Sequence, residues 1–378
     1  MDDEARATGL APASGRYPTK GYQRGRRSPY RHPRHDGSQG SGADGQDVSG
    51  PTYAALDLGT NNCRLLVARA TRDSFRVIDA FSRIVRLGEG ITASGRLSEA
   101  AIVRAIEALG VCRAKMRNRG VTRSQLIATE ACRSAANGVD FLDRVRAEVG
   151  IDLDIVDRET EARLAATGCA PLVDPAADGV ILFDIGGGSS ELVRLGPQLS
   201  TRHGPPHPQI RAWISIPIGV VTLAERHGGI TVSREQFEAM IAEVAVHVDR
   251  FAAEHGGIDG LHMLGTSGTV TTIAGVYLEL PRYERRHVDG CWMSAAQVTG
   301  VVERLLGMSY ESRVANPCIG AERADLVLAG CAILEAIRRA FPCDRLRVAD
   351  RGLREGMLVQ MMRADGAWGS ASGSEAAS

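Results

Sequence analysis

The sequence predicts an α/β protein built from two similar domains. The chain has 378 residues, a length that corresponds to two domains of roughly 100 to 200 residues each. The predicted order of strands and helices, βββαβαβα, occurs twice. Each copy opens with an aspartate at the end of a buried strand, followed by a turn of small residues. Hydrophobic content of 44% and charged content of 24% are those of folded globular proteins.

The first copy begins with three predicted strands. Ser98 is placed to cap the helix that follows, an apolar stripe runs along that helix, and Gly120 is placed to end it. The predicted strands are 53–58, 63–70, 75–84, 126–129 and 153–156, and the other predicted helices are 139–149 and 159–167.

The second copy follows a short Pro/Asp/Ala-rich break at 171–179. A capping box of Ser233 and Gln236 begins its long helix, which Gly256 ends. Two inserted helices are expected, one capped by Ser294 and one over 321–341, and a last helix closes the chain. The predicted strands are 180–185, 190–195, 212–216, 261–264 and 346–349.

Composition divides the chain into four parts. We expect a disordered basic arm at 1–51, domains at 52–170 and 171–363, and a disordered tail at 364–378, with the last helix a candidate to pack back on the first domain. Seven basic residues and no acidic one lie between Arg16 and Arg34, without the apolar periodicity that a fold needs. A solvated tail is the preferred interpretation of the arm, and contact with nucleic acid or polyphosphate is the alternative.

The overall charge is balanced, since 45 basic residues face 45 acidic ones. A polyanion is therefore not indicated as a general partner, and an anion site must be local. The eight cysteines include no C-x-x-C pair and suggest reduced thiols, hence a cytoplasmic location. No apolar run reaches the 18 or so residues of a membrane span.

The two glycine turns align without a gap from Asp57 and Asp184 onward. Small and hydroxylic residues follow each aspartate, so each turn exposes main-chain N–H groups of the kind that bind anions. An aspartate beside an anion would repel it unless a cation lay between them. Asp57, Asp184 and Glu191 are therefore candidate ligands of a hydrated Mg²⁺ held against a phosphate.

Two further features bear on this site. Seven residues after each aspartate stands a charged residue, and the two have opposite signs: Arg64 in the first hairpin and Glu191 in the second. A third turn, at 265–269, follows a strand and opens a helix, where free N–H groups favour phosphate. One Asp-Gly hairpin alone would more often be an ordinary turn than an anion site. The two matched hairpins at Asp57 and Asp184 favour the anion site instead, and the turn at 265–269 alone is a weak signal.

The sequence resembles the exopolyphosphatase and guanosine pentaphosphate phosphohydrolase family, within the actin, Hsp70 and sugar kinase superfamily. The resemblance covers about 53–360 and rests on LDLGTNNCR at 56–64, ATEACRSAAN at 128–137, EARL at 161–164, DIGGGSSEL at 184–192, GTSGT at 265–269 and LREG at 353–356. It implies two ribonuclease-H-like (actin-like ATPase) domains with mixed five-stranded sheets and an interdomain cleft. It also implies Mg²⁺ and hydrolysis of a terminal phosphoanhydride.

The same resemblance implies roles for single residues. It places the catalytic carboxylate at Glu161, with Asp184 and Glu191 beside it, and Glu159 is the competitor on sequence alone. It matches Arg64 and Arg133 to phosphate-contacting arginines, whereas pairing with Glu130 is the alternative for Arg133. The candidate phosphate-binding residues are Gly59, Thr60, Asn61, Asn62, Arg64, Arg133, Gly186, Gly187, Gly188, Ser189, Ser190, Gly265, Ser267, Gly268 and Thr269.

The expected substrate is inorganic polyphosphate, with pppGpp as the alternative. An actin-like ATPase or kinase and a non-catalytic (p)ppGpp sensor are the rival functions. Asn62 replaces a hydroxyl residue usual in the family, and the chain ends 22 residues after Gly356, as in the short two-domain form. We expect neither a membrane nor nucleic acid as a partner, and analogy alone suggests a homodimer.

Overall fold

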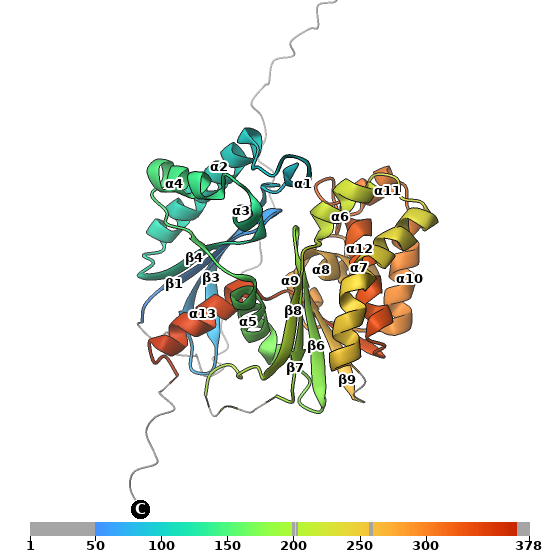
Figure 1. Cartoon of the computed structure of the whole chain (residues 1–378). Helices are drawn as coiled ribbons and strands as arrows, with labels where there is room; N and C mark the ends of the chain where they lie inside the picture. The colour runs from blue at the N-terminus through green and yellow to red at the C-terminus, as the bar shows by residue number, and fades with distance from the viewer. Residues whose placement is uncertain (1–49, 199–200, 202, 257–259, 369–378) are drawn as a thin grey trace, which may run out of the picture. The chain divides into compact units, whose positions relative to one another are not determined.

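The first sheet has five strands in a computed structural model, which describes residues 50–198, 201, 203–256 and 260–368. Nearly all of the expected arm 1–51 and the last ten residues of the expected tail lie outside these ranges. The order is β3-β2-β1-β4-β5, with β1 antiparallel to β2 and parallel to β4 (Figure 1). The strands are β1 (Tyr53–Leu58), β2 (Asn62–Ala70), β3 (Phe75–Ile84), β4 (Arg123–Ala128) and β5 (Asp154–Ile155).

The second sheet repeats this arrangement and adds a strand. Its order is β10-β11-β9-β6-β7-β8, with β6 antiparallel to β7 and parallel to β9. The sequence predicted five strands, and the sixth, β10, has only three residues, too few for a periodic signal. The strands are β6 (Gly179–Ile185), β7 (Ser190–Leu195), β8 (Ile210–Ile216), β9 (Leu261–Thr266), β10 (Trp292–Ser294) and β11 (Arg345–Ala349). The prediction of an α/β fold with two mixed sheets is confirmed.

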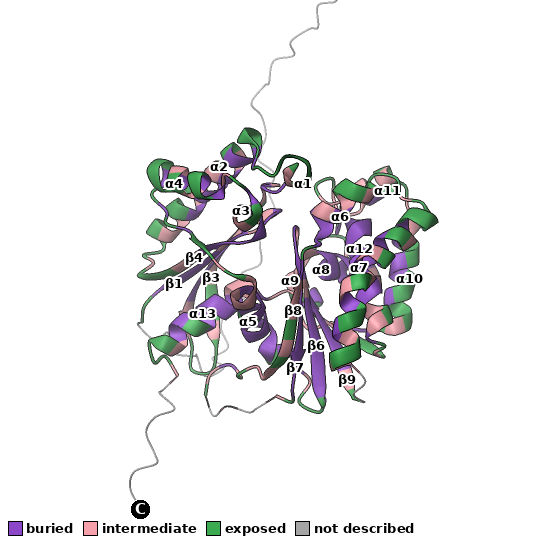
Figure 2. Cartoon of the chain, viewed as in Figure 1, coloured by how far each residue is buried: buried purple, intermediate pink, exposed green. Residues whose placement is uncertain are grey.

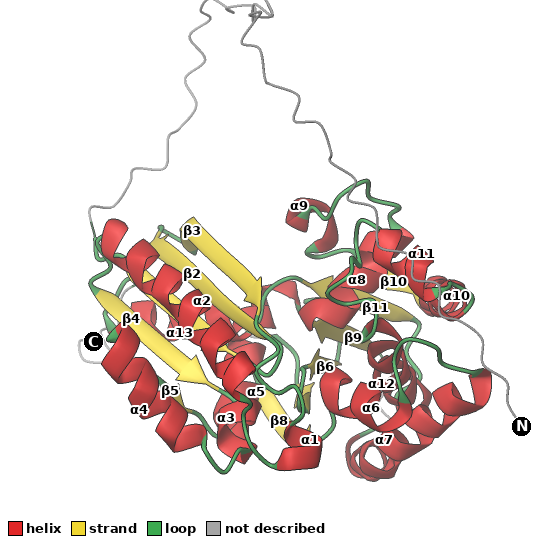
Figure 3. Cartoon of the chain, turned by 90° about the horizontal axis from the view of Figure 1, so that it is seen from above, coloured by secondary structure: helices red, strands yellow, loops and turns green. Residues whose placement is uncertain are grey.

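The two-residue period of the strands divides the first core into two layers. Ala54, Leu56 and Leu58 of β1 pack toward the layer that holds α2, while Tyr53 and Ala55 pack toward α13 on the other face. Figure 3 shows α2 lying across these strands. We call this sheet and its helices the first lobe; the helices are α1 (Ile91–Ser94), α2 (Glu99–Asn118), α3 (Glu130–Ser134), α4 (Gly138–Val149) and α5 (Arg158–Cys169).

The second lobe comprises the second sheet and the helices that cover it. Ile181 and Phe183 of β6 face a large core shared with α7, α8 and α12, and Figure 2 shows the continuous burial of β6 and α12. The expected helix over 321–341 begins later, because residues 321–326 form turns. Its helices are α6 (Val220–His227), α7 (Arg234–His255), α8 (Ser267–Tyr277), α9 (Arg285–Val288), α10 (Ala295–Leu306), α11 (Tyr310–Ala315) and α12 (Val327–Ala340).

Helices α5 and α13 (Leu353–Ala364) join the two lobes. Ala162 and Ala166 of α5 pack against the second sheet, and Met357 and Leu358 of α13 pack against the first. The two helices touch closely, because a methyl group at Gly356 would lie 2.0 Å from the Leu164 carbonyl oxygen. This crossing sets the two sheets beside a common cavity.

The C-terminal boundary differs from the expected one. The tail predicted to begin at residue 364 is folded as far as Trp368, whose indole Nε1 donates to the Thr71 carbonyl at 2.9 Å. The hydroxyl of Tyr53 also donates to Asp365 at 3.0 Å. Sequence patterns missed this extension because two single side chains make the contacts, without a periodic run.

Candidate functional site

A cavity of about 850 Å³ lies between the two lobes. Strand ends, turns and helix N-termini meet there, where polar groups gather at the edges of α/β sheets. The predicted site residues that line it are Asp57, Gly59, Thr60, Asn61, Asn62, Arg64, Glu161, Asp184, Gly186, Gly187, Gly188, Ser189, Glu191, Ser267, Gly268 and Thr269.

The two glycine turns have the same construction. The Gly59 N–H donates to the Asn62 carbonyl at 2.8 Å, and the Gly186 N–H donates to the Ser189 carbonyl at 3.0 Å. The strand registers also correspond, since Asp57 lies opposite Arg64 in one hairpin and Asp184 lies opposite Glu191 in the other. The alignment drawn from sequence therefore matches the register of both hairpins.

The turns of the two hairpins face each other at short range. A methyl group built at Gly187 would lie 3.2 Å from the main-chain nitrogen of Asn61, and one built at Gly188 would lie 2.8 Å from Thr60 Oγ1. No atom of the described residues accepts a hydrogen bond from the N–H groups of Thr60, Asn61, Gly187 or Gly188. Two sets of free donors thus meet in one cavity, an arrangement suited to an anion with several oxygens.

Eight carboxylate side chains of the described residues line this cavity, and three of them, Asp57, Asp184 and Glu191, come from the two hairpins. Burial raises the pKa of Asp57, and it raises the pKa of Asp184 to about 6, with the Asp57 charge adding to the effect. Burial and the neighbouring Asp184 raise the pKa of Glu191, although hydroxyl donors oppose the shift. Those donors are Ser189 at 2.9 Å and Ser215 at 2.8 Å. Burial is the largest cause of each shift, so these carboxyl groups hold their protons more tightly than they would in water.

Glu161 enters the cavity from the first turn of α5 and is 7% exposed. Burial and the charge of Glu191 raise its pKa, and the charge of Arg133 opposes this. Arg133 Nη2 donates to Glu161 Oε2 at 2.7 Å and to Glu130 Oε2 at 2.6 Å. A buried carboxyl whose orientation Arg133 fixes can act as a general base once it is ionised.

The competing carboxylate Glu159 lies outside this network. It accepts from Arg163 at 2.6 Å, its side chain is 46% exposed, and it is not among the cavity residues. The position of the two side chains around α5 separates them, since residues two apart on a helix do not share a face.

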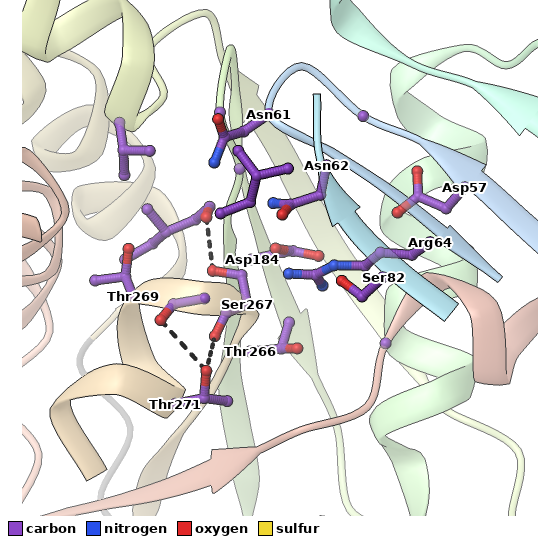
Figure 4. Close-up of a pocket in the computed structure, with 18 of the residues that line it drawn as sticks. Asp57, Asn61, Asn62, Arg64, Ser82, Asp184, Thr266, Ser267, Thr269 and Thr271 are labelled. Carbon is purple, nitrogen blue, oxygen red and sulfur yellow. Dashed lines mark hydrogen bonds between the residues drawn. The ribbon is translucent and has the colours of Figure 1, made fainter. Parts of the chain in front are cut away.

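The third turn contributes the N-terminus of α8. Ser267 has φ of 87°, a conformation that is uncommon outside glycine, and its hydroxyl donates to the Ile185 carbonyl at 2.6 Å. Thr271 Oγ1 donates to the Ser267 carbonyl at 2.9 Å, and Figure 4 draws these bonds around Ser267 as dashed lines. The N–H groups of the first helical turn remain available to an anion.

Three predicted residues do not line the cavity, and these are Arg133, Ser190 and Gly265. The Ser190 hydroxyl donates to the Ile218 carbonyl at 2.8 Å. A methyl group at Gly265 would lie 2.6 Å from the Phe183 ring, so this glycine permits core packing. Arg133 reaches the site through Glu161.

Among the residues that the structure describes, five arginines that the sequence did not predict as site residues also line the cavity, and these are Arg83, Arg285, Arg323, Arg351 and Arg354. Burial lowers the pKa of Arg323 and of Arg354, and in both cases the charge of Arg64 adds to the effect. The Arg323 Cζ lies 3.7 Å from the position of a methyl group at Gly268, beside the N-terminus of α8. Figure 4 shows Arg64 extending toward Asp184. An anion bound beside these guanidinium groups would favour their charged form.

The sequence contained a signal for Arg354 and none for Arg323. Arg354 belongs to the LREG segment at 353–356, which carried the resemblance without an assigned role. Arg323 stands in a turn among other charged residues, and only the fold brings it to the cavity.

The carboxylate cluster fits a hydrated cation better than a closed metal site. Within the described ranges, no group of three or more His, Cys, Asp or Glu side chains is arranged to hold a metal ion. Mg²⁺ bound to phosphates usually takes only one or two protein carboxylates and keeps several waters. Asp184 and Glu191, on adjacent strands with raised pKa values, suit such an ion. None of the helices in residues 50–368, apart from the undescribed gaps, is long and apolar enough to span a membrane.

Comparisons with known proteins agree on the family. The profile described as the Ppx/GppA phosphatase family matches residues 66–365. A relative in Photobacterium profundum, named guanosine-5'-triphosphate,3'-diphosphate pyrophosphatase, is 26% identical; the match covers 82% of this chain and 59% of the relative. A putative exopolyphosphatase of Haemophilus influenzae is 25% identical, with 82% of this chain and 90% of the relative covered.

A solved structure shows the same fold. The crystal structure of the Aquifex aeolicus member of the Ppx/GppA protein family has a TM-score of 0.68 to this chain and 28% sequence identity. The match covers 83% of this chain and 98% of the other.

Proposed function

Because the chain belongs to the Ppx/GppA phosphatase family, we propose that it is an exopolyphosphatase, which hydrolyses the terminal phosphoanhydride of inorganic polyphosphate and releases orthophosphate. One observation carries the proposal. The free N–H groups of two facing turns and the guanidinium groups of Arg64, Arg323 and Arg354 surround a cavity, and Glu161 projects into it. Donors of this number and placement suit a ligand with many anionic oxygens.

Glu161 would orient the attacking water and take its proton. The water oxygen forms a bond to the terminal phosphorus, and the bridging P–O bond breaks, so that its electron pair leaves with the shortened chain. The turn N–H groups and the arginines stabilise the charge that develops on the transferred group. Arg133, which donates to Glu161 at 2.7 Å, keeps that carboxylate in place and favours its ionised form.

We assign Mg²⁺ as the cofactor, held by Asp184 and Glu191 with Asp57 nearby. When bound, the ion would neutralise phosphate charge next to the carboxylates. Without a cation, the carboxylates would repel the substrate that the arginines attract, and this conflict supports the assignment.

The pppGpp 5'-phosphohydrolase activity is the second candidate, and one feature favours it. Apolar residues, including Ile319, Leu326 and Val327, also line the cavity, and a nucleoside would find contacts with them that a bare phosphate chain does not need. The relatives named for this activity are longer, since the chain spans only 59% and 60% of two of them.

The decisive experiment compares orthophosphate release from polyphosphate, pppGpp and ATP under identical conditions with Mg²⁺. Release from polyphosphate at the highest kcat/KM supports the proposal, and preference for pppGpp supports the second candidate. Preference for ATP would point to an actin-like ATPase. Binding of ppGpp without turnover of any substrate would indicate a sensor.

A further inference from the structure

Arg86 links the two lobes next to the glycine turns. Arg86 lies in the segment 85–90, between β3 and α1 of the first lobe. Its Nη1 donates to Asp325 Oδ2 at 2.9 Å and its Nη2 to Asp325 Oδ1 at 3.0 Å. Nη2 also donates to the Glu322 carbonyl at 3.1 Å. Both acceptors belong to the turn that precedes α12 in the second lobe, and paired bonds of this kind fix direction as well as distance.

The backbone of Arg86 is held in an unfavourable conformation. Its φ of 46° lies in the left-handed region, which long side chains rarely adopt. Such strain persists only where the surrounding structure fixes it, and it is frequent at functional positions. Arg104 helps to hold the backbone at Arg86, because its Nε donates to the carbonyl of the preceding residue, Val85, at 2.8 Å.

The same segment supports the first glycine turn from behind. The N–H groups of Val85 and Arg86 donate to the Asn61 carbonyl at 2.9 and 3.1 Å, and the Gly88 N–H donates to the Thr60 carbonyl at 2.9 Å. In a trans peptide the carbonyl and the following N–H point in opposite directions. Holding the Thr60 carbonyl backward therefore turns the Asn61 N–H forward, toward Gly187.

In the second lobe, Arg86 holds the turn that carries Arg323. Glu322 and Asp325 flank Arg323, and the N–H groups of Leu326 and Val327 donate to the Arg323 carbonyl at 3.0 Å each. Because Arg86 binds on both sides of this residue, it restricts the turn from which the Arg323 guanidinium reaches Gly268.

A second bond between the lobes runs parallel to the first. The Gly90 N–H donates to Glu225 Oε1 at 2.8 Å. Glu225 belongs to α6, and the first N–H groups of that helix, those of Val220 and Val221, donate to the Gly186 and Gly187 carbonyls at 2.9 Å each. The segment 85–90, which holds the first glycine turn, is thus bonded to α6, which holds the second.

We propose that Arg86 is a positioning residue that, through Asp325, holds the lobes so that both glycine turns and Arg323 reach one phosphate chain together. This inference rests on the proposed function. Without the Arg86–Asp325 bonds, only a fraction of the molecules should hold the lobes in this arrangement. The apparent affinity for polyphosphate then falls in proportion to that fraction. The effect should therefore appear in KM, since bound substrate itself draws the turns together.

The experiment compares R86M, D325N and the double variant R86M/D325N with the wild-type full chain. Steady-state kinetics on polyphosphate should show KM raised by roughly 10-fold in each variant, with kcat within about 2-fold. The double variant should be no worse than either single one, because both remove the same interaction. R86K, which keeps the charge and loses the paired geometry, should recover part of the affinity.

The matched control is R339M. Arg339 makes an equivalent pair of bonds to Glu238, at 2.7 and 2.9 Å, but both residues lie on helices of the second lobe. A KM increase in R339M equal to that in R86M would overturn the proposal. It would also be overturned if the loss of affinity in R86M were fully explained by a lower Tm, that is, by partial unfolding.

A distance measurement keeps the inference separate from the proposed function. Spin labels on unnatural amino acids at Val139 and Val246, which are 67% and 74% exposed on the two lobes, report the spacing of the lobes without substrate. R86M and D325N should broaden the distance distribution, and R339M should not. An unchanged distribution in R86M refutes the positioning role. A wild-type chain inactive on both polyphosphate and pppGpp would refute the proposed function instead.

Discussion

Arg133 Nη2 lies 2.7 Å from Glu161 Oε2, and the same nitrogen donates to Glu130 at 2.6 Å. The guanidinium also donates to the Val156 carbonyl. The sequence left two roles open for Arg133, phosphate contact and pairing with Glu130. The structure contains the pairing, joins it to the candidate base, and places Arg133 outside the cavity wall. Phosphate contact by Arg133 stays a prediction.

This contact predicts how activity depends on pH. The positive charge of Arg133 opposes the raised pKa of Glu161, so R133M should raise that pKa further. A general base acts when ionised, hence R133M should lose about 10-fold in kcat at neutral pH for each unit of pKa change and recover as the pH rises. The pH profile of kcat between pH 6 and 10 measures the shift.

Arg158 offers a matched control for R133M. It donates to Glu130 at 2.9 Å and makes no bond to Glu161 among the described residues. In R158M, the fall of kcat at low pH should therefore occur at the same pH as in the wild type. Coincident profiles for R133M and wild type would mean that Arg133 does not tune Glu161.

Neutralising the candidate base gives a second prediction. E161Q keeps the shape of the side chain and removes its basicity, so turnover should fall by at least about 10³-fold, within the range for general base catalysis. Polyphosphate binding, measured by equilibrium dialysis, should persist. E159Q is the control, because Glu159 is paired with Arg163 and half-exposed. Undiminished turnover in E161Q would remove Glu161 from the mechanism.

The part of the site that local sequence encodes was predictable. The gap-free alignment of the two turns translated directly into equal registers, with Asp57 opposite Arg64 and Asp184 opposite Glu191. Hairpins allow this because a short turn fixes the pairing of its strands. Neighbouring residues of a hairpin point to opposite sides, so the alignment alone does not tell which hydroxyl of a turn faces the site. Ser189 reaches Glu191, while the next residue, Ser190, bonds to Ile218 instead.

Residues brought in by tertiary structure were not predictable. Arg323 reaches the α8 N-terminus only because the turn before α12 folds over Gly268. Trp368 and Asp365 were expected in the tail, yet single long-range contacts to Thr71 and Tyr53 hold them. Neither kind of contact leaves a periodic or motif signal in the chain.

The carboxylate cluster predicts a stability penalty that depends on pH. Burial raises the pKa of Asp184 from its usual 3.8 to about 6, so the folded state binds this proton more tightly than the unfolded chain. The resulting stabilisation is complete below about pH 4 and is lost as the pH rises through 6. D184N should therefore be more stable than wild type at pH 8, by about 3 kcal/mol at 1.4 kcal/mol per pKa unit.

Thermal unfolding at pH 4.5 and pH 8 measures this difference. The Tm gain of D184N should shrink toward the lower pH, and Mg²⁺ at pH 8 should raise the Tm of wild type more than that of D184N. D249N, at an exposed position of α7, controls for the loss of a charge in general. Equal Tm values for D184N and wild type at both pH values would show that Asp184 carries no such penalty.

The short distance between the two turns yields the last prediction. A methyl group at Gly188 would lie 2.8 Å from Thr60 Oγ1 and 3.1 Å from Glu130 Cγ, so G188A should displace these two side chains or the turns themselves by a few tenths of an ångström. Catalysis that needs both sets of N–H donors on one phosphate should then lose kcat/KM, by less than the roughly 10²-fold that a misplacement of about 1 Å can cost. In G110A the added methyl in α2 meets no atom within 4 Å, and this variant should keep full activity. Retained activity in G188A, with its fold intact by circular dichroism, would mean that the two turns act on the substrate independently.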